Sequence, residues 1–450
     1  MSNLVQAFMR NLSFVLLVLL LVGCAGEGPP VGSVIFVHPD GASAATWAAG
    51  RALHVGPDAD LNWDRLPAIG VYRGHMADCL TATSNGGGTT HAYGVKVLSD
   101  AYGTWGGKEA RRILDSRGQS ASVARQALAA GLGVGLVQSG DSIEPGTGCF
   151  VASVASRKAS DRITAELLAS GAQVLLGGGE QYFLPEGVAG VHGPGKRTDG
   201  RNLIDEARAA GYEVVRTRQE LLGLSSGTRR VLGLFAASHS FNDKTEEQLA
   251  AAGLPLYAPE APTLAEMTRA ALKVLQNNGK RFLLVVEEEG TDNFGNKNNA
   301  SGVLEALRRA DEALGVGREF VRRNPGTLLM TTADSDAGGM RMVGIAMPPG
   351  RKPPATLPAT APNGSPLDGA SGTGSEPFWA APDATGQRLP FAITWAARDD
   401  VSGGILVRAE GFNSHLVRGS MDNTQVAELI RLTLLGPWRA SALKPAAAPR

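Results

Sequence analysis

The sequence has few cysteines, no excess of either charge and only one long apolar run. Each of these features excludes some classes of protein. The 43 basic and 43 acidic residues give a formal net charge of zero. The chain therefore lacks the basic surface expected of a nucleic-acid-binding protein and the acidic tail expected of a partner for basic proteins. With 450 residues, 43% of them hydrophobic and 19% charged, it has an ordinary globular composition and can bury a large core.

The long apolar run, residues 12–22, stands close to the N-terminus, follows Arg10 and leads into Leu-Val-Gly-Cys, which ends at Cys24. A basic flank, a short apolar stretch and small residues before a cleavage point describe a secretory signal. The last four residues resemble a bacterial lipobox, which implies removal of residues 1–23 and a lipid on the Cys24 sulfur. An ordinary N-terminal membrane helix is the alternative, but the run is short for a full span. We therefore expect an exported periplasmic or cell-surface protein, attached to the membrane only through this lipid.

Only three cysteines are present. With Cys24 assigned to the lipid, Cys79 and Cys149 remain. An exported protein can oxidise such a pair, but the sequence does not determine whether the two lie close enough.

Short apolar runs alternate along the chain with segments of helical periodicity. Six runs are continuously apolar, as expected of strands covered on both faces, and they occupy residues 31–41, 134–141, 172–180, 229–236, 281–289 and 326–335. Segments with apolar residues at three- and four-residue spacing occupy residues 122–132, 161–171, 263–278 and 300–323. This alternation predicts an α/β fold with a mostly parallel central sheet sandwiched between helix layers.

The chain shows no fixed-period repeat, and we predict one folded domain over residues 24–438. Residues 348–377 are rich in Pro, Gly, Ser and Thr, and are expected to form a loop because an apolar element returns at 389–400. Residues 439–450 are expected to form a disordered tail.

Acidic residues recur where the expected strands end. Asp40, Glu287, Asp334 and Asp400 each follow an apolar run, and in "LLVVEEEGTDNFGNK" Asp292 comes five residues after Glu287. Each one alone could be a helix cap or a turn residue. Several at the same edge of a parallel sheet would converge, and converging carboxylates require cations. The pattern therefore favours a metal site over a solvated acidic loop.

A candidate nucleophile lies in "CLTATSNGGGTTHAYGVKVLSD", residues 79–100. Thr83, Ser84 and Asn85 precede a glycine run, and we expect a helix from Thr89. A hydroxyl at a helix N-terminus gains from the helix dipole and the free N–H groups, which also suit a phosphate. The alternative is that Ser84 only caps the helix.

These segments together resemble the alkaline phosphatase family, over nearly the whole mature chain. "VIFVHPDG" resembles the family's opening strand and places its metal-bridging aspartate on Asp40. "TSNGGGTTHAYGVK" resembles the nucleophile segment and places the serine on Ser84, with Thr83 where the family has aspartate. Ser-Arg-Lys in "VASVASRKASDRITAELLASG" places the phosphate-clamping arginine on Arg157.

The resemblance also implies a set of metal ligands. "VVEEEGTDNFGNKNN" places a magnesium-binding glutamate on Glu287 and a metal-binding aspartate on Asp292, and "LLMTTADSDAGG" places another on Asp334. Within "SIEPGTGCF", Glu144 and Thr147 are candidate magnesium ligands. The family's three zinc-binding histidines fall on residues that are not histidine, namely Asn296, Ser335 and Asp400.

Asn, Ser and Asp offer oxygen where the family offers imidazole nitrogen. Oxygen sites suit Mg²⁺, Ca²⁺ or Mn²⁺, whereas nitrogen-rich sites suit zinc. We therefore expect two or three divalent ions per chain, with Mg²⁺ first, Ca²⁺ or Mn²⁺ next, and the family's Zn²⁺ still open. The histidines at positions 38, 75, 91, 239 and 415 fall elsewhere and are interpreted as structural.

The resemblance implies a metal-dependent phosphomonoester hydrolase that acts through a phosphoserine and releases inorganic phosphate from small-molecule esters. A phosphodiesterase of the same superfamily is one alternative, because the fold does not choose between them. A lipid-anchored phosphate-binding protein without turnover is another. A sulfatase would need a Cys/Ser-x-Pro-x-Arg context, which is absent around Ser84. Nucleic-acid partners are not expected, and a homodimer stays open.

Overall fold

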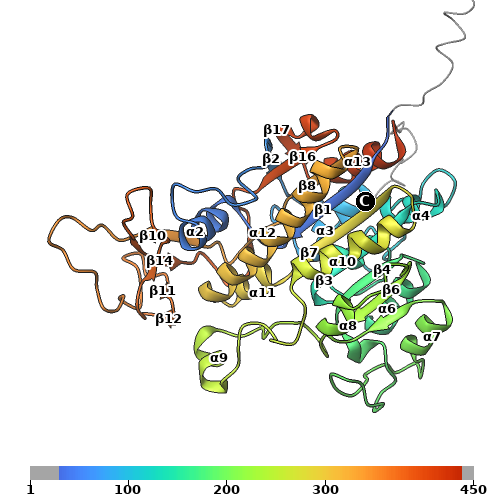
Figure 1. The fold of residues 1–450 in the computed structure, drawn as a ribbon, viewed down its shortest axis with the longest axis horizontal. Helices are drawn as coiled ribbons and strands as arrows, with labels where there is room; N and C mark the ends of the chain where they lie inside the picture. Colours follow the sequence, from blue (N-terminus) through green and yellow to red (C-terminus); the bar gives the residue numbers. More distant parts are fainter. Residues whose placement is uncertain (1–29, 438–450) are drawn as a thin grey trace, which may run out of the picture.

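A ten-stranded sheet runs through the middle of the protein, with helices packed on both of its faces (Figure 1). The computed structural model describes residues 30–437. The expected signal segment 1–23, the lipid site at Cys24 and the expected tail 439–450 lie outside the described residues.

Nine of the ten strands of this sheet run in the same direction, and β16 runs in the opposite direction. The strand order is β17 (Arg418–Asp422), β2 (Ala68–Arg73), β16 (Leu406–Gly411), β8 (Thr327–Thr331), β1 (Ser33–Pro39), β7 (Phe282–Glu288), β3 (Gly133–Asp141), β4 (Val174–Gly178), β6 (Val231–Leu234) and β5 (Glu213–Val215). Neighbouring strands are parallel except where β16 pairs with β8 and β2. The expected α/β architecture with a mostly parallel sheet is confirmed.

The central strand β1 is covered on both faces, which explains the apolar run in its sequence. Val34 and Phe36 pack into the hydrophobic core on one face of the sheet, whereas Ile35 and Val37 pack into the core on the other face. All four side chains are fully buried. Successive side chains of a strand point to opposite faces, so a strand covered on both sides needs apolar residues at every position.

Two layers of helices supply these cores. The layer against Val34 and Phe36 contains α3 (Ser84–Tyr93), α4 (Val123–Ala129), α6 (Ser160–Ala169), α7 (Leu203–Ala209) and α13 (Thr424–Leu435). The layer against Ile35 and Val37 contains α2 (Ala44–His54), α8 (Arg218–Leu222), α10 (Leu264–Asn277) and α12 (Ala300–Arg323). Shorter elements are α5 (Pro145–Gly148), α9 (Glu246–Ala252), α11 (Gly290–Asn296) and the 3-10 turns η1 (Glu180–Tyr182) and η2 (Ser414–Leu416).

The two long helices begin at residues that their sequences mark as caps. Thr263 and Glu266 form a reciprocal capping box at the start of α10. The Asn299 side chain accepts a hydrogen bond from the Gly302 N–H at the start of α12. As a result α12 covers the expected residues 300–323 and lies along the sheet beside α10 (Figure 1).

A second, smaller sheet lies to one side of the main sheet, next to α2 (Figure 1). It contains β10 (Arg341–Gly344), β14 (Pro390–Thr394), β11 (Leu367–Gly369), β12 (Gly372–Thr373) and β13 (Phe378–Trp379). The Pro/Gly-rich residues 348–377 run without strands as far as 366 and then form β11 and β12, and the expected apolar return is β14. A separate pair, β9 (Asp336–Ala337) with β15 (Asp400–Val401), joins residues on either side of this excursion.

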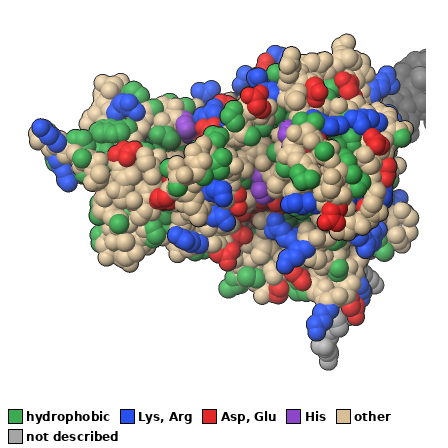
Figure 2. All heavy atoms as spheres, turned by 90° about the horizontal axis from the view of Figure 1, so that it is seen from below, with side chains coloured by type: hydrophobic (Ala, Val, Ile, Leu, Met, Phe, Trp, Pro, Cys, Tyr) green, Lys and Arg blue, Asp and Glu red, His purple; other side chains and the backbone are tan. Residues whose placement is uncertain are grey.

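Two properties of the described residues are the apolarity of their helices and the distribution of charge on the face drawn in Figure 2. Within residues 30–437, no helix combines the length and apolarity needed to cross a membrane. On the face in Figure 2, basic and acidic side chains are interspersed, in keeping with the zero net charge. Cys79 is exposed and Cys149 is buried, and both are free thiols.

Candidate active site

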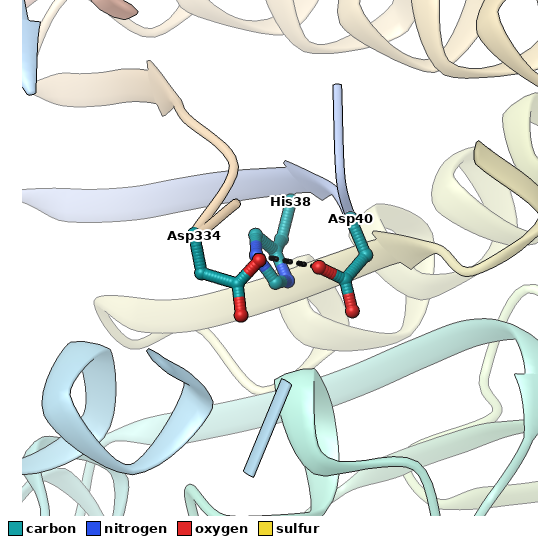
Figure 3. A group of neighbouring side chains, drawn as sticks. All are labelled: His38, Asp40 and Asp334. Carbon is teal, nitrogen blue, oxygen red and sulfur yellow. Dashed lines mark ion pairs between the residues drawn. The ribbon is translucent and has the colours of Figure 1, made fainter. Parts of the chain in front are cut away.

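Three carboxylates meet where neighbouring parallel strands end. Asp40 follows β1, Glu287 lies on β7 opposite His38 of β1, and Asp334 follows β8. Because β8, β1 and β7 are adjacent and parallel, their carboxyl ends lie at one edge of the sheet. All three side chains are buried. Figure 3 shows the carboxylates of Asp40 and Asp334 directed toward each other, with the His38 ring between them.

A second group of expected ligands gathers beside the first, at α11 and the β9–β15 pair. The Ser335 hydroxyl donates to Asp400 Oδ1 at 3.1 Å, and Asn296 Nδ2 donates to Asp292 Oδ1 at 3.0 Å and to Asp400 Oδ1 at 3.4 Å. The Asn296 oxygen instead accepts from the Gly338 N–H at 3.2 Å. Asn296 therefore joins the group as a hydrogen-bond donor, whereas a metal ligand would present its oxygen.

Burial and mutual repulsion raise the pKa values of these carboxyls. Burial raises the pKa of Asp40 well above its usual range, and the charge of Asp292 raises it further. Burial also raises the pKa of Asp334 well above its usual range, and the charge of Asp40 raises it further. Burial and then the charge of Asp400 raise the pKa of Asp292 in the same way. Burial, with Asp334 next, raises the pKa of Asp400 to about 6. The ionised cluster is therefore unfavourable without added positive charge.

Several buried oxygens in the cluster also lack hydrogen-bond partners among the described residues. They are both carboxylate oxygens of Asp40, both of Asp334, Oε1 of Glu287 and Oε2 of Glu289. Leaving such atoms unpaired costs about 1–3 kcal/mol each, and more for charged groups. Divalent cations bound by these oxygens would satisfy them and relieve the repulsion, so the donor set fits metal ions.

Glu289 belongs to this cluster although the sequence analysis did not single it out. Oxygens of Asp40, Glu287 and Glu289 lie within 4.8 Å of one another, and all three residues are buried. Glu288, the middle residue of the three glutamates, is different. Its Oε1 accepts hydrogen bonds from Ser139 Oγ at 2.6 Å and Tyr257 Oη at 2.7 Å, so the protein supplies partners for this oxygen, whereas Oε2 has none among the described residues.

The nucleophile segment differs from the sequence expectation at its helix start. The helix expected from Thr89 begins at Ser84, so the glycine run lies inside α3. Thr83 is the cap: its hydroxyl accepts from the Gly86 N–H at 3.2 Å and donates to the Ser99 carbonyl at 2.5 Å. Ser84 is the first helical residue and is buried, so the interpretation of Ser84 as a simple cap is wrong.

The glycines allow α3 to approach the carboxylates. A Cβ on Gly87 would lie 2.3 Å from Asp334 Oδ2, and one on Gly88 would lie 2.6 Å from the Pro145 carbonyl oxygen of α5. Both distances are shorter than a Cβ tolerates, so only glycine fits. The first turn of α3, which carries Ser84, is thus pressed against Asp334.

The remaining expected residues lie around α5. Arg157 Nη2 donates to Glu144 Oε2 at 2.5 Å, and burial raises the pKa of Glu144 although Arg157 opposes this. Thr147 Oγ1 accepts a hydrogen bond from Gln138 at 3.4 Å, and Gln138 also donates to Glu287. Glu144 is therefore held in an ion pair with Arg157, and Thr147 is connected to Glu287 through one side chain.

His38, which the sequence analysis interprets as structural, lies among the carboxylates of the site. Its Nδ1 lies 3.3 Å from Glu287 Oε1, and its Nε2 lies 3.8 Å from Asp40 Oδ1 and 4.0 Å from Asp334 Oδ1. Burial lowers the pKa of the ring, but Glu287 and Asp334 raise it further, so that the pKa lies above its ordinary value. The signal in the sequence was the two-residue spacing of His38 and Asp40, which puts both on one face of a strand.

Comparison with known proteins identifies the family of this chain. The family model "Alkaline phosphatase" matches residues 32–366. The chain belongs to the alkaline phosphatase family. The membrane-bound alkaline phosphatase of Bombyx mori is 28% identical over 339 residues, which are 67% of this chain and 60% of that protein. Alkaline phosphatase 4 of Bacillus subtilis strain 168 is 29% identical over 259 residues, 56% of this chain and 48% of that protein.

The fold agrees with this membership. The crystal structure of Thermus thermophilus alkaline phosphatase superimposes with a TM-score of 0.70 at 23% identity, covering 92% of this chain and 93% of that one. The match spans only about half to three-fifths of the two curated relatives, as their coverage of 48% and 60% shows. Family and fold are therefore established.

Proposed function

We propose that this chain is a metal-dependent phosphomonoester hydrolase that releases inorganic phosphate from small-molecule phosphate esters through a phosphoserine at Ser84. The contact that carries this proposal is that of α3 with Asp334. Through Gly87 it brings the helix turn that begins with Ser84 to Asp334, which belongs to a buried group of carboxylates suited to divalent cations. A helix N-terminus favours the negative charge of a phosphoryl group.

We assign the following roles in catalysis to residues of this chain. The Ser84 oxygen attacks the phosphorus atom as the ester P–O bond breaks, and the alcohol leaves with the proton that the serine hydroxyl loses. Water then cleaves the phosphoserine to inorganic phosphate and free Ser84. The N-terminus of α3 faces the negative charge that develops on the phosphoryl group. Arg157 binds phosphate oxygens through the N–H groups that Glu144 leaves free, and Glu144 fixes the orientation of the guanidinium. Divalent cations, when bound, would polarise the serine and phosphoryl oxygens.

Three groups of residues would hold these cations. Asp40 and Asp334 share the first position, and Asp292, Ser335 and Asp400 form the second, with Asn296 beside it. The third contains Asp40, Glu287 and Glu289, with Thr147 and Glu144 close by. Mg²⁺ suits the oxygen donors, with Mn²⁺ or Ca²⁺ next.

We also propose that the protein is exported and anchored through a lipid on Cys24, with a homodimer as one open arrangement. The motif that ends at Cys24 supports the anchor. Mass spectrometry of the mature N-terminus tests it, because an unmodified Cys24 would exclude a lipid anchor.

The decisive variant for the proposed function is Ser84→Ala. We expect it to abolish turnover of an aryl phosphate and to remove the phosphoserine found after acid quenching. Thr83→Ala is the matched control, because it removes a helix cap worth about 1 kcal/mol and leaves Ser84 in place. Loss of activity in Thr83→Ala with full activity in Ser84→Ala would place the nucleophile one residue earlier.

Two further measurements separate the alternatives. Faster hydrolysis of a diester than of a monoester would identify a phosphodiesterase. Binding of phosphate without turnover and without a labelled serine would identify a non-catalytic phosphate-binding protein.

A further inference from the structure

The His38 imidazole points into the carboxylate cluster, and its polar contacts there are with carboxylates. The side chain is fully buried, and Nε2 has no hydrogen bond among the described residues. Nε2 faces Asp40 and Asp334, at 3.8 and 4.0 Å from their nearest oxygens (Figure 3). Nδ1 faces Glu287 Oε1, at 3.3 Å.

The strand and the core behind it hold the ring in this orientation. His38 and Asp40 are two residues apart, so they lie on the same face at the end of β1 as Phe36. The His38 ring stacks on Phe36, with centroids 5.9 Å apart, and meets the edge of His91 at 5.3 Å. The ring therefore presents Nε2 to the two aspartates without needing to move.

Two other histidines of residues 30–437 have Nε2 paired in the usual way, although Nδ1 of His91 also has no hydrogen-bond partner. His91 Nε2 is 2.7 Å from the Tyr72 hydroxyl, and His192 Nε2 is 2.9 Å from the Arg216 carbonyl oxygen. A histidine that serves only packing is normally paired like this. His38 is instead surrounded by carboxylates that themselves lack partners.

We propose that His38 Nε2 is a ligand of the metal ion held by Asp40 and Asp334. Zinc–nitrogen and zinc–oxygen bonds are about 2.0–2.2 Å long, so two donors of one ion lie no more than about 4.2 Å apart. Both observed distances meet this limit. The contact of Nδ1 with Glu287 is the carboxylate–histidine–metal arrangement that orients a ligating imidazole.

His38 makes the two neighbouring ion positions chemically different. The position at Asp40 and Asp334 combines nitrogen with oxygen donors, which favours Zn²⁺, Mn²⁺ or Co²⁺ over Mg²⁺. The position at Asp292, Ser335 and Asp400 has only oxygen donors and suits Mg²⁺. The sequence predicted only oxygen ligands, whereas His38 adds a nitrogen ligand at the position of Asp40 and Asp334. Ligation by His38 rests on the metal dependence of the proposed function but not on turnover.

Pulsed electron paramagnetic resonance of the Mn²⁺-loaded protein tests the ligand directly. After removal of metals with a chelator and loading with Mn²⁺, the wild type should show coupling to an imidazole nitrogen. His38→Gln should lose this coupling, and the matched control His239→Gln should keep it. His239 is the control because its Nε2 lies 3.9 Å from Glu144 Oε1, which makes it another histidine beside a carboxylate of the site.

A wild-type spectrum without imidazole coupling would overturn the proposal, even if His38→Gln failed to fold. Coupling that survives in folded His38→Gln would overturn it as well. In competition dialysis, His38→Gln should lower Zn²⁺ affinity at least about tenfold relative to Mg²⁺ affinity. An unchanged ratio would contradict the proposal. Imidazole coupling in a protein without phosphatase activity would support His38 ligation and reject the proposed function, so the two failures are distinguishable.

Discussion

Adding one methyl group at Gly87 tests whether the nucleophile helix touches the metal cluster. In Gly87→Ala the new Cβ would lie 2.3 Å from Oδ2 of Asp334, 2.4 Å from its Cβ and 2.8 Å from its Cγ. Carbon atoms pack at about 3.5–4.0 Å, so α3 or Asp334 has to move by about 1 Å.

The effects of this variant on stability and on activity should differ in size. Alanine is better than glycine inside a helix by about 1 kcal/mol, and overpacking costs about 1–3 kcal/mol, so the free energy of unfolding should fall by no more than about 2 kcal/mol. A displacement of 1 Å at reacting groups costs about 100-fold in rate. We therefore expect kcat/KM on an aryl phosphate to fall about 100-fold and bound metal to fall with it.

The assay combines steady-state kinetics, metal analysis and urea denaturation of the wild type, Gly87→Ala and Gly344→Ala. Gly344 is the control because a Cβ there meets nothing within 4 Å. Gly344→Ala should therefore leave kinetics, metal content and the free energy of unfolding unchanged. Activity and metal content of Gly87→Ala within about threefold of the wild type would refute the contact between α3 and Asp334.

Two further predictions concern charge. The folded-state pKa of Asp400 is raised to about 6, above about 3.9 in the unfolded chain. Between these pH values the folded, metal-stripped protein binds more protons, so the contribution of Asp400 to stability is lost as pH rises. In urea titrations of metal-stripped protein, the free energy of unfolding of the wild type should fall relative to that of Asp400→Asn as the pH rises over this range. Saturating Mg²⁺ should remove this fall. A relative rise in the free energy of unfolding would contradict the raised pKa of Asp400. Arg157→Lys keeps the charge but not the forked donors, so kcat/KM should fall at least about tenfold with little change in stability, and unchanged kinetics would exclude Arg157 from phosphate binding.

The sequence was sufficient for six of the ten strands of the main sheet, because each of the six contains a run of apolar residues. A strand covered on both faces must be apolar wherever it packs against a core, as β1 is over residues 34–37 and β7 over residues 282–286, and such runs alternating with helical periodicity leave few other folds. The strands β2, β5, β16 and β17 carry exposed or half-buried residues and were not predicted. The acidic residues at the strand ends were visible for the same reason, since parallel strands bring their carboxyl ends to one edge.

The parts that the sequence did not predict depend on contacts between distant segments. Helix propensity places a break at the glycine run, but contact with Asp334 makes glycine necessary inside α3. His38 looked structural because its partners come from β7 and from the segment after β8. The roles of Glu288 and Glu289 are separated by Ser139 and Tyr257, whose hydroxyls donate to the carboxylate of Glu288 and not to that of Glu289. The amide orientation of Asn296 is likewise decided by the Gly338 N–H.

Anomalous diffraction from crystals of the Mn²⁺-loaded protein tests most directly whether the buried carboxylates hold divalent cations beside Ser84. The account predicts one anomalous peak between Asp40 and Asp334, next to the first turn of α3, and another among Asp292, Ser335 and Asp400. The absence of an anomalous peak at these carboxylates in crystals soaked in saturating Mn²⁺ would contradict the proposed cation sites. In that case the carboxylate oxygens would be protonated and hydrogen-bonded to one another.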